Sequence, residues 1–181
     1  MRLKKTLMNW YKYITIKKRC PSDAREEADK ILEEWDDICK SLGIEYFILH
    51  GTCLGLVRDH GYIKGDDDLD VGVKCTVDEK IKLKLELKKH GFFVSEEHAT
   101  NLHFHRDCIT LDIWFSFGRH EKFLSTYDTV HYNGGIYNVP HPVEGYLEER
   151  YGQDWRIPKK YRFKWFDKFR KDPYNMKVTK R

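Results

Sequence analysis

The chain has 181 residues, a length typical of one domain with a substantial core. Its five cysteines are odd in number, irregularly spaced and without a Cys-x-x-Cys pair, which argues against a zinc site or a disulfide framework and favours a reducing compartment. No run of residues approaches the length of a transmembrane helix, and the first twenty residues lack the apolar core of a secretory signal. We therefore expect a cytoplasmic protein.

Positive charge is concentrated at the two ends of the chain. Residues 1–20 hold seven Lys/Arg and no acid, and residues 156–181 hold eleven Lys/Arg against two Asp, so a net charge of +4 leaves −12 for the middle. Both ends mix aromatic with basic residues, a pattern that suits an anionic membrane surface or nucleic acid. The alternative is that the aromatics pack on the domain while the lysines are solvated. We expect a basic arm over 1–20, a folded domain over 21–158 and a basic aromatic tail over 159–181.

The first part of the domain reads as helix, strand and short helix. Apolar residues recur at helical spacing from Ser22 to Leu42, and Gly43 ends that segment. Residues 46–50 form an apolar run that predicts a buried strand, and residues 52–59 predict a short helix opening at Gly51-Thr52. Such a helix N-terminus can bring backbone N–H groups to a phosphate.

An acidic run follows this short helix. Asp66, Asp67 and Asp68 are consecutive, and Asp70 lies between the apolar residues Leu69 and Val71. Alternation predicts a strand over 68–73 with Asp66, Asp68 and Asp70 on one face and Asp67 on the other. Three acids in a row are often a solvated turn. Here the interleaved apolar residues indicate that the run enters the core, where adjacent carboxylates need a cation such as Mg²⁺.

The rest of the domain alternates between strands and helices. Cys108 to Phe117 is an apolar run with Asp112 as its one acid, and a buried lone acid needs a partner, which the metal held by Asp68 and Asp70 would supply. Asn133-Gly134 indicates a tight hairpin. The remaining expected elements are a capped helix over 76–90, strands over 92–97, 101–106, 127–132 and 135–139, and a helix over 143–151.

The ordered set of these motifs resembles the LicD family, which includes phosphocholine transferases and fukutin-type ribitol-phosphate transferases. The residues that carry the resemblance are Gly51-Thr52, Leu54, Gly55, Arg58, Asp66 to Asp70, Leu111 to Trp114, Tyr146-Leu147, Tyr151 to Trp155 and Pro158. The resemblance implies an α+β fold of the nucleotidyltransferase type, a mixed β-sheet with flanking helices. It also places Asp112 as the third acid, on a strand beside the one that bears Asp68 and Asp70.

The resemblance implies an enzyme that moves a phospho-alcohol group from a CDP-activated donor to a glycan or lipid-linked glycan. Mg²⁺ or Mn²⁺ would be held by Asp68, Asp70 and Asp112, and Asp66 or Asp112 would take the acceptor's proton. Gly51, Thr52, Arg58, Tyr146 and Tyr151 would contact substrate, although Arg58 can equally form a surface ion pair.

Two other functions fit parts of the sequence. The first is a true nucleotidyltransferase that uses the same acids with a nucleoside triphosphate. The second is a non-catalytic module whose basic ends bind nucleic acid, which we consider the weaker interpretation because surface acids would not be interleaved with apolar residues. Peripheral membrane contact through the basic ends is a further expectation.

Overall fold

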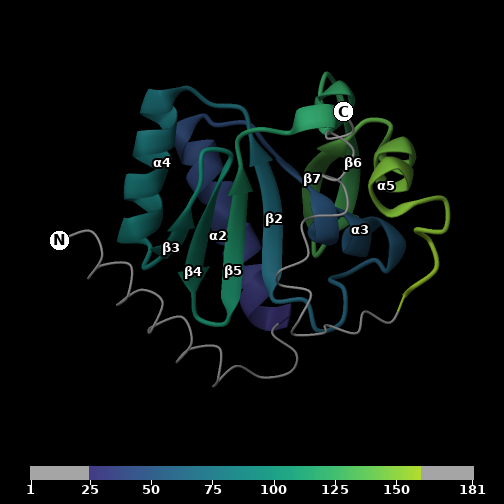
Figure 1. Ribbon diagram of the computed structural model, residues 1–181. Coiled ribbons are helices and arrows are strands. Elements are labelled where there is room, and N and C mark those ends of the chain that lie inside the picture. Colours follow the sequence, from purple (N-terminus) through teal and green to yellow (C-terminus); the bar gives the residue numbers. More distant parts are fainter. Residues whose placement is uncertain (1–24, 160–181) are drawn as a thin grey trace, which may run out of the picture.

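The computed structural model describes residues 25–159, and the expected N-terminal arm and nearly all of the expected C-terminal tail lie outside this range. A five-stranded mixed sheet forms the centre of the domain in the order β1-β2-β5-β4-β3 (Figure 1). Only β2 and β5 pair in parallel, and the other neighbours are antiparallel. The strands are β1 (Tyr46–Ile48), β2 (Asp68–Val73), β3 (Phe93–Glu97), β4 (Asn101–Arg106) and β5 (Ile109–Trp114).

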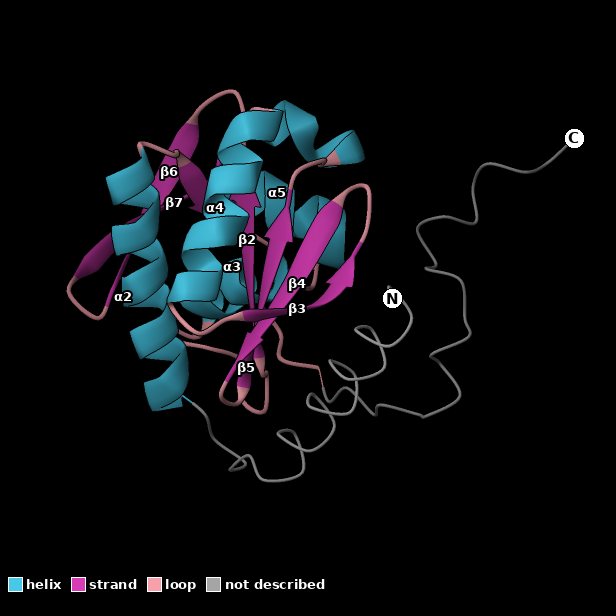
Figure 2. Cartoon of the chain, turned by 90° about the vertical axis from the view of Figure 1, so that its left-hand side faces the viewer, coloured by secondary structure: helices cyan, strands magenta, loops and turns pink. Residues whose placement is uncertain are grey.

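Two helices, α2 (Arg25–Leu42) and α4 (Val77–Lys89), lie together on one side of this sheet (Figure 2). The apolar stripe predicted for the first helix is buried, with Trp35 fully inaccessible and Ile31 and Leu32 nearly so. Burial of these side chains supplies the main favourable free energy of folding. The opposite face of the sheet is left for the acidic side chains.

A second group of elements packs beside the β1 edge of the sheet. It contains α3 (His50–Arg58), the hairpin of β6 (Tyr127–Tyr132) and β7 (Gly135–Pro140), and α5 (Val143–Tyr151). A short 3-10 helix, η1 (Gly118–Phe123), connects β5 to the hairpin. Phe47 of β1 stacks on Tyr127 of β6 with ring centroids 5.1 Å apart, which joins the hairpin to the sheet.

Most predicted elements are present, with shifted ends. The α+β class is as predicted, and β2 and α5 have the predicted bounds. Both Asn133 and Gly134 have positive φ, as a type I′ hairpin turn requires. The capping box of Thr76 and Glu79 on α4 is present. The first strand ends at Ile48 because the short helix begins at His50, two residues earlier than predicted. The 3-10 helix η1 was not predicted.

The cysteines correct one expectation. Cys108 is disulfide-bonded, whereas Cys39, Cys53 and Cys75 are free thiols. The count and spacing of cysteines do not reveal this bond, because pairing depends on the distance between side chains in the fold. The expected reducing compartment stays a prediction. Separately, no helix within residues 25–159 combines the length and apolar character needed to cross a membrane.

Candidate active site

Asp70 occupies the centre of the candidate site and is held from two sides. Its Oδ2 accepts a hydrogen bond from the Gly51 backbone N–H at 3.0 Å, and its Oδ1 accepts one from Trp114 Nε1 at 3.2 Å. Its own backbone N–H donates to Thr52 Oγ1 at 2.8 Å. The side chain of Asp70 is thereby fixed in one orientation at the N-terminus of α3, where the helix dipole favours negative charge.

These contacts change the role expected for Gly51 and Thr52. The Gly51 N–H that was expected to meet a phosphate is used by Asp70, and the N–H of His50 donates to Tyr146 Oη at 3.1 Å. Thr52 is only 2% exposed, and its hydroxyl supports Asp70. In this structure the opening of α3 binds a carboxylate of the chain itself.

The acidic run converges on the same point. An ideal Cβ on Gly51 would lie 3.1 Å from Asp66 Oδ2 and 3.4 Å from Asp70 Oδ2, so both carboxylates approach this glycine closely. Asp66, Asp67 and Asp68 each offer an oxygen within 4.8 Å of the others. The expectation that Asp67 faces away is wrong, because β2 begins at Asp68 and strand alternation does not extend to the preceding turn.

The third acid lies where the resemblance placed it. Asp112 on β5 is the direct partner of Asp70 on the parallel strand β2, so the two side chains project from the same face of the sheet. His103 on β4 is the partner of Asp112 on the other side, and its Nδ1 lies 2.5 Å from Asp112 Oδ1. The hydrogen bond to Asp112 raises the pKa of His103. This imidazole was not predicted as a site residue.

Burial and mutual repulsion raise the pKa of the central acids. Burial, followed by the charges of Asp70, Asp66 and Asp112, raises the pKa of Asp68 to about 9. Burial and the charge of Asp112 raise the pKa of Asp70 to about 7, although the Gly51 N–H and Trp114 oppose the shift. Both acids therefore resist ionisation until positive charge arrives.

A divalent cation fits these residues. The potential ligands are all carboxylate oxygens, the set that Mg²⁺ and Mn²⁺ prefer, and a Cβ on Gly51 would crowd the carboxylates of Asp66 and Asp70. The raised pKa of Asp68 and Asp70 is the expected state of a cation site without its counter-charge. Whether Asp112 completes the ligand set stays a prediction.

A cavity of about 710 Å³ opens beside the acids. Asp66, Asp67 and Asp68 line one wall, and Arg58, Tyr151 and Trp155 are among the residues of the other walls. Arg58 forms the ion pair that the sequence left open, with its Nη2 2.6 Å from Asp59 Oδ2, yet it also lines the cavity. The volume of the cavity lies in the range of small-molecule pockets.

Tyr146 does not line this cavity, contrary to expectation. Its side chain is fully buried, and its hydroxyl oxygen lies 2.7 Å from His50 Nδ1. Tyr146 is a packing residue, because it lies on the face of α5 that contacts α3 and η1. Its ring makes an edge-to-face contact with Phe123 of η1. Tyr151, one turn later, does reach the cavity.

Arg150 is a neighbour of the site that the sequence reasoning missed. It lies next to Tyr151 on α5, and its charge lowers the pKa of Asp70 and that of His50. A half-buried cation beside a cluster of acids compensates part of their repulsion. In the sequence, the feature that could have indicated Arg150 is its position directly before Tyr151, a residue expected to contact substrate.

Comparison with known proteins agrees with this geometry. The family model described as LicD/FKTN/FKRP, nucleotidyltransferase domain, matches residues 43–167. The chain is 27% identical over 158 residues to ribitol-5-phosphate transferase FKTN of Mus musculus, covering 74% of this chain and 34% of that protein. It is 32% identical over 98 residues to the uncharacterized protein RP689 of Rickettsia prowazekii (strain Madrid E), covering 54% of this chain and 36% of that protein. The chain thus spans about a third of the length of these relatives.

Solved structures show the same fold. The solution structure of the antibiotic-resistance factor ANT(2'')-Ia superposes with a TM-score of 0.55 at 13% identity, covering 81% of this chain and 82% of that one. The crystal structure of ANT(2'')-Ia in complex with adenylyl-2''-tobramycin gives a TM-score of 0.52 at 12% identity, covering 78% and 84%. With the match over residues 43–167, the acids Asp68, Asp70 and Asp112 lie in a nucleotidyltransferase-like fold, and the chain belongs to the LicD family.

Proposed function

We propose that this chain is a metal-dependent phosphotransferase that moves a phospho-alcohol group, such as phosphocholine or ribitol phosphate, from a CDP-activated donor to a glycan hydroxyl. The observation that carries the proposal is the approach of Asp66 and Asp70 to Gly51 at the start of α3, with Asp68 beside Asp66 and Asp112 alongside Asp70. The name of the FKTN relatives supports a phospho-alcohol substrate. Because the chain covers about a third of those proteins, the substrate is part of the proposal.

Asp68, Asp70 and Asp112 would hold Mg²⁺ or Mn²⁺, with Asp66 assisting. A cation held there would neutralise the donor phosphates and stabilise the charge that develops during phosphoryl transfer. Gly51, Thr52 and Trp114 contribute by fixing Asp70 before substrate arrives, so that little reorganisation is needed during the reaction.

The cavity walls provide for the donor and the acceptor. Arg58 would contact a donor phosphate once it leaves Asp59, and Tyr151 would pack against the sugar or the base. Asp66 or Asp112 would accept the proton of the attacking hydroxyl, a step that needs a carboxylate within hydrogen-bonding distance of that hydroxyl. The acceptor would be a glycan or a lipid-linked glycan, and the basic ends of the chain would contact an anionic membrane surface.

A ligand panel tests this proposal. Thermal unfolding would be followed in Mg²⁺ or Mn²⁺ with CDP-choline, CDP-ribitol, CDP-glycerol, CTP or ATP, for the native chain and the Asp68→Ala/Asp70→Ala variant. Asp107→Asn is the matched control, because Asp107 is exposed and outside the site. Ligand binding to the folded state raises the midpoint of unfolding by mass action.

We expect a metal-dependent rise with one CDP-alcohol that the double variant loses and the control keeps, together with release of CMP when acceptor glycan is added. A rise confined to CTP or ATP would replace the proposal by a nucleotidyltransferase reaction. No rise with any of the five compounds, in a chain that still unfolds cooperatively, would overturn it.

A further inference from the structure

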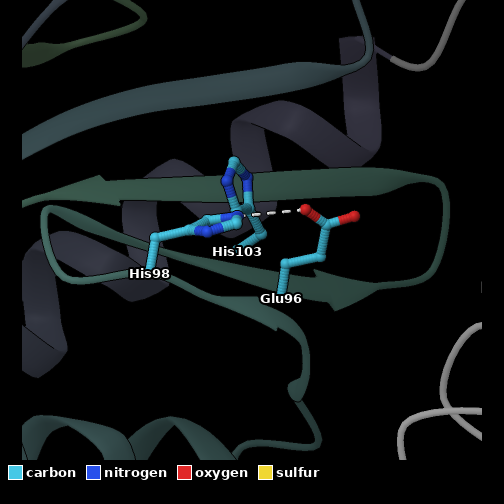
Figure 3. Close-up of side chains that lie close together, drawn as sticks. All are labelled: Glu96, His98 and His103. Carbon is cyan, nitrogen blue, oxygen red and sulfur yellow. Dashed lines mark hydrogen bonds and ion pairs between the residues drawn. The ribbon is translucent and has the colours of Figure 1, made fainter.

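A second group of possible metal ligands lies on the same face of the sheet as the acids. Glu96 pairs with His103, His103 with Asp112 and Asp112 with Asp70, so one row of side chains crosses four strands. His98 joins the far end of this row (Figure 3). This end contains imidazole nitrogens, whereas the candidate active site contains only carboxylate oxygens as potential ligands.

The β3–β4 hairpin brings the three side chains together. Glu96 lies on β3, His98 directly follows that strand, and His103 lies opposite Glu96 on β4. The backbone N–H of His98 donates to the Asn101 carbonyl at 2.9 Å, which holds the turn. His98 Nε2 lies 3.2 Å from Glu96 Oε2, and each of the three residues offers a ligand atom within 4.8 Å of the others.

His103 is already oriented as a metal-binding histidine. Its Nδ1 bonds Asp112, which leaves Nε2 as the nitrogen with the free electron pair. That nitrogen is contacted at 2.7 Å by Asn101 Nδ2, and a metal would take the place of this amide. A carboxylate that fixes the remote nitrogen of a ligating imidazole is the usual outer-shell arrangement at zinc sites.

We propose that Glu96, His98 and His103 form a binding site for a transition-metal dication such as Zn²⁺. Two imidazoles and one carboxylate satisfy three positions of a tetrahedral zinc ion, and water fills the fourth. The site differs in chemistry from the acids at α3, which suit Mg²⁺. It does not depend on the transferase reaction.

Calorimetric titration of the full chain with ZnCl₂, in excess Mg²⁺, tests the proposal. We expect one zinc ion per chain and at least a tenfold loss of affinity in His98→Ala and in Glu96→Gln. His131→Ala is the matched control, since His131 is an exposed strand histidine on the other hairpin. The side chains of Glu96 and His98 are 63% and 54% exposed, so both variants should keep the metal-free unfolding temperature of the native chain.

Two further measurements separate this site from other ligands of zinc. The Asp68→Ala/Asp70→Ala variant should bind zinc at least as tightly as the native chain, because its changes leave the hairpin intact and remove the competing Mg²⁺ site. The visible spectrum of the Co²⁺ form should show tetrahedral d–d bands without a thiolate charge-transfer band. Equal affinity in His98→Ala and the native chain, loss of zinc in the double aspartate variant, or a thiolate band would each overturn the proposal.

Discussion

Replacing Asp70 by Asn should remove the contribution of this carboxyl to the pH dependence of stability in the metal-free chain. Burial and Asp112 raise the pKa of Asp70 from 3.8 to about 7 in the folded state. Between these two values the unfolded chain releases a proton that the folded chain keeps, so stability falls as pH rises. At about 1.4 kcal/mol per pKa unit, the loss is at most about 4 kcal/mol and is complete above pH ~7.

The Asn variant has a constant penalty instead. Its single amide oxygen can accept from either the Gly51 N–H or Trp114 Nε1, and the donor left over costs about 1–3 kcal/mol at every pH. The raised pKa of Asp70 changes how the free energy of unfolding varies with pH, whereas the unpaired donor lowers this free energy equally at every pH. The slope against pH therefore separates the two effects. Asp107→Asn, a change of the same chemistry at an exposed position, is the matched control.

Urea unfolding of the native chain, Asp70→Asn and Asp107→Asn from pH 4 to 8, in EDTA, measures these slopes. The difference between the native chain and Asp70→Asn should shrink or reverse as pH rises. Repeating the series in Mg²⁺ should flatten the native curve, because a cation favours the ionised carboxylates. Parallel curves for the native chain and Asp70→Asn in EDTA would refute a raised pKa at Asp70.

Two other substitutions test the support of the site by stability measurements. Thr52→Val removes the acceptor of the buried Asp70 N–H and should lower the free energy of unfolding by about 1–3 kcal/mol, and an unchanged urea midpoint would contradict that role. Gly72→Ala would place a Cβ 2.2 Å from the Phe47 ring and should lower the free energy of unfolding by about 1–3 kcal/mol or more, as overpacking does in other cores. Gly145→Ala, whose Cβ would meet nothing closer than 3.4 Å, is the control and should change the midpoint little. Equal midpoints for both alanine variants would show that the ring above Gly72 moves freely.

The acids of β2 were predictable because their signal is local. Apolar residues alternate with Asp68 and Asp70 within six residues, and burial follows directly from that alternation. Asp67 was misplaced because the same rule was applied beyond the start of the strand. The hairpin at Asn133-Gly134 and the capping box at Thr76 are local in the same sense, and both are present.

The roles of Gly51 and Tyr146 could not be read from the sequence. Whether the first N–H groups of a helix meet a ligand or a side chain depends on what the fold brings there, and the partners of Gly51 and His50 are 19 and 96 residues away. The pattern indicated that a negative group belongs at this helix N-terminus. It did not indicate that the group is Asp70.

The carboxylate of Asp112 lies between His103 on β4 and Asp70 on β2. Its Oδ1 lies against His103 Nδ1 on one side, and its strand register places it beside Asp70 on the other, so a cation held by Asp70 and Asp112 would share this carboxylate with the imidazole. The bond to His103 also fixes the carboxylate before a cation binds, which lowers the cost of ordering it. A metal on His103 Nε2 would make Nδ1–H a stronger donor and draw charge from Asp112. Since coupling between two binding sites is reciprocal, occupancy of the hairpin site should weaken the affinity of the acids for Mg²⁺, and Mg²⁺ should weaken the hairpin site by the same factor.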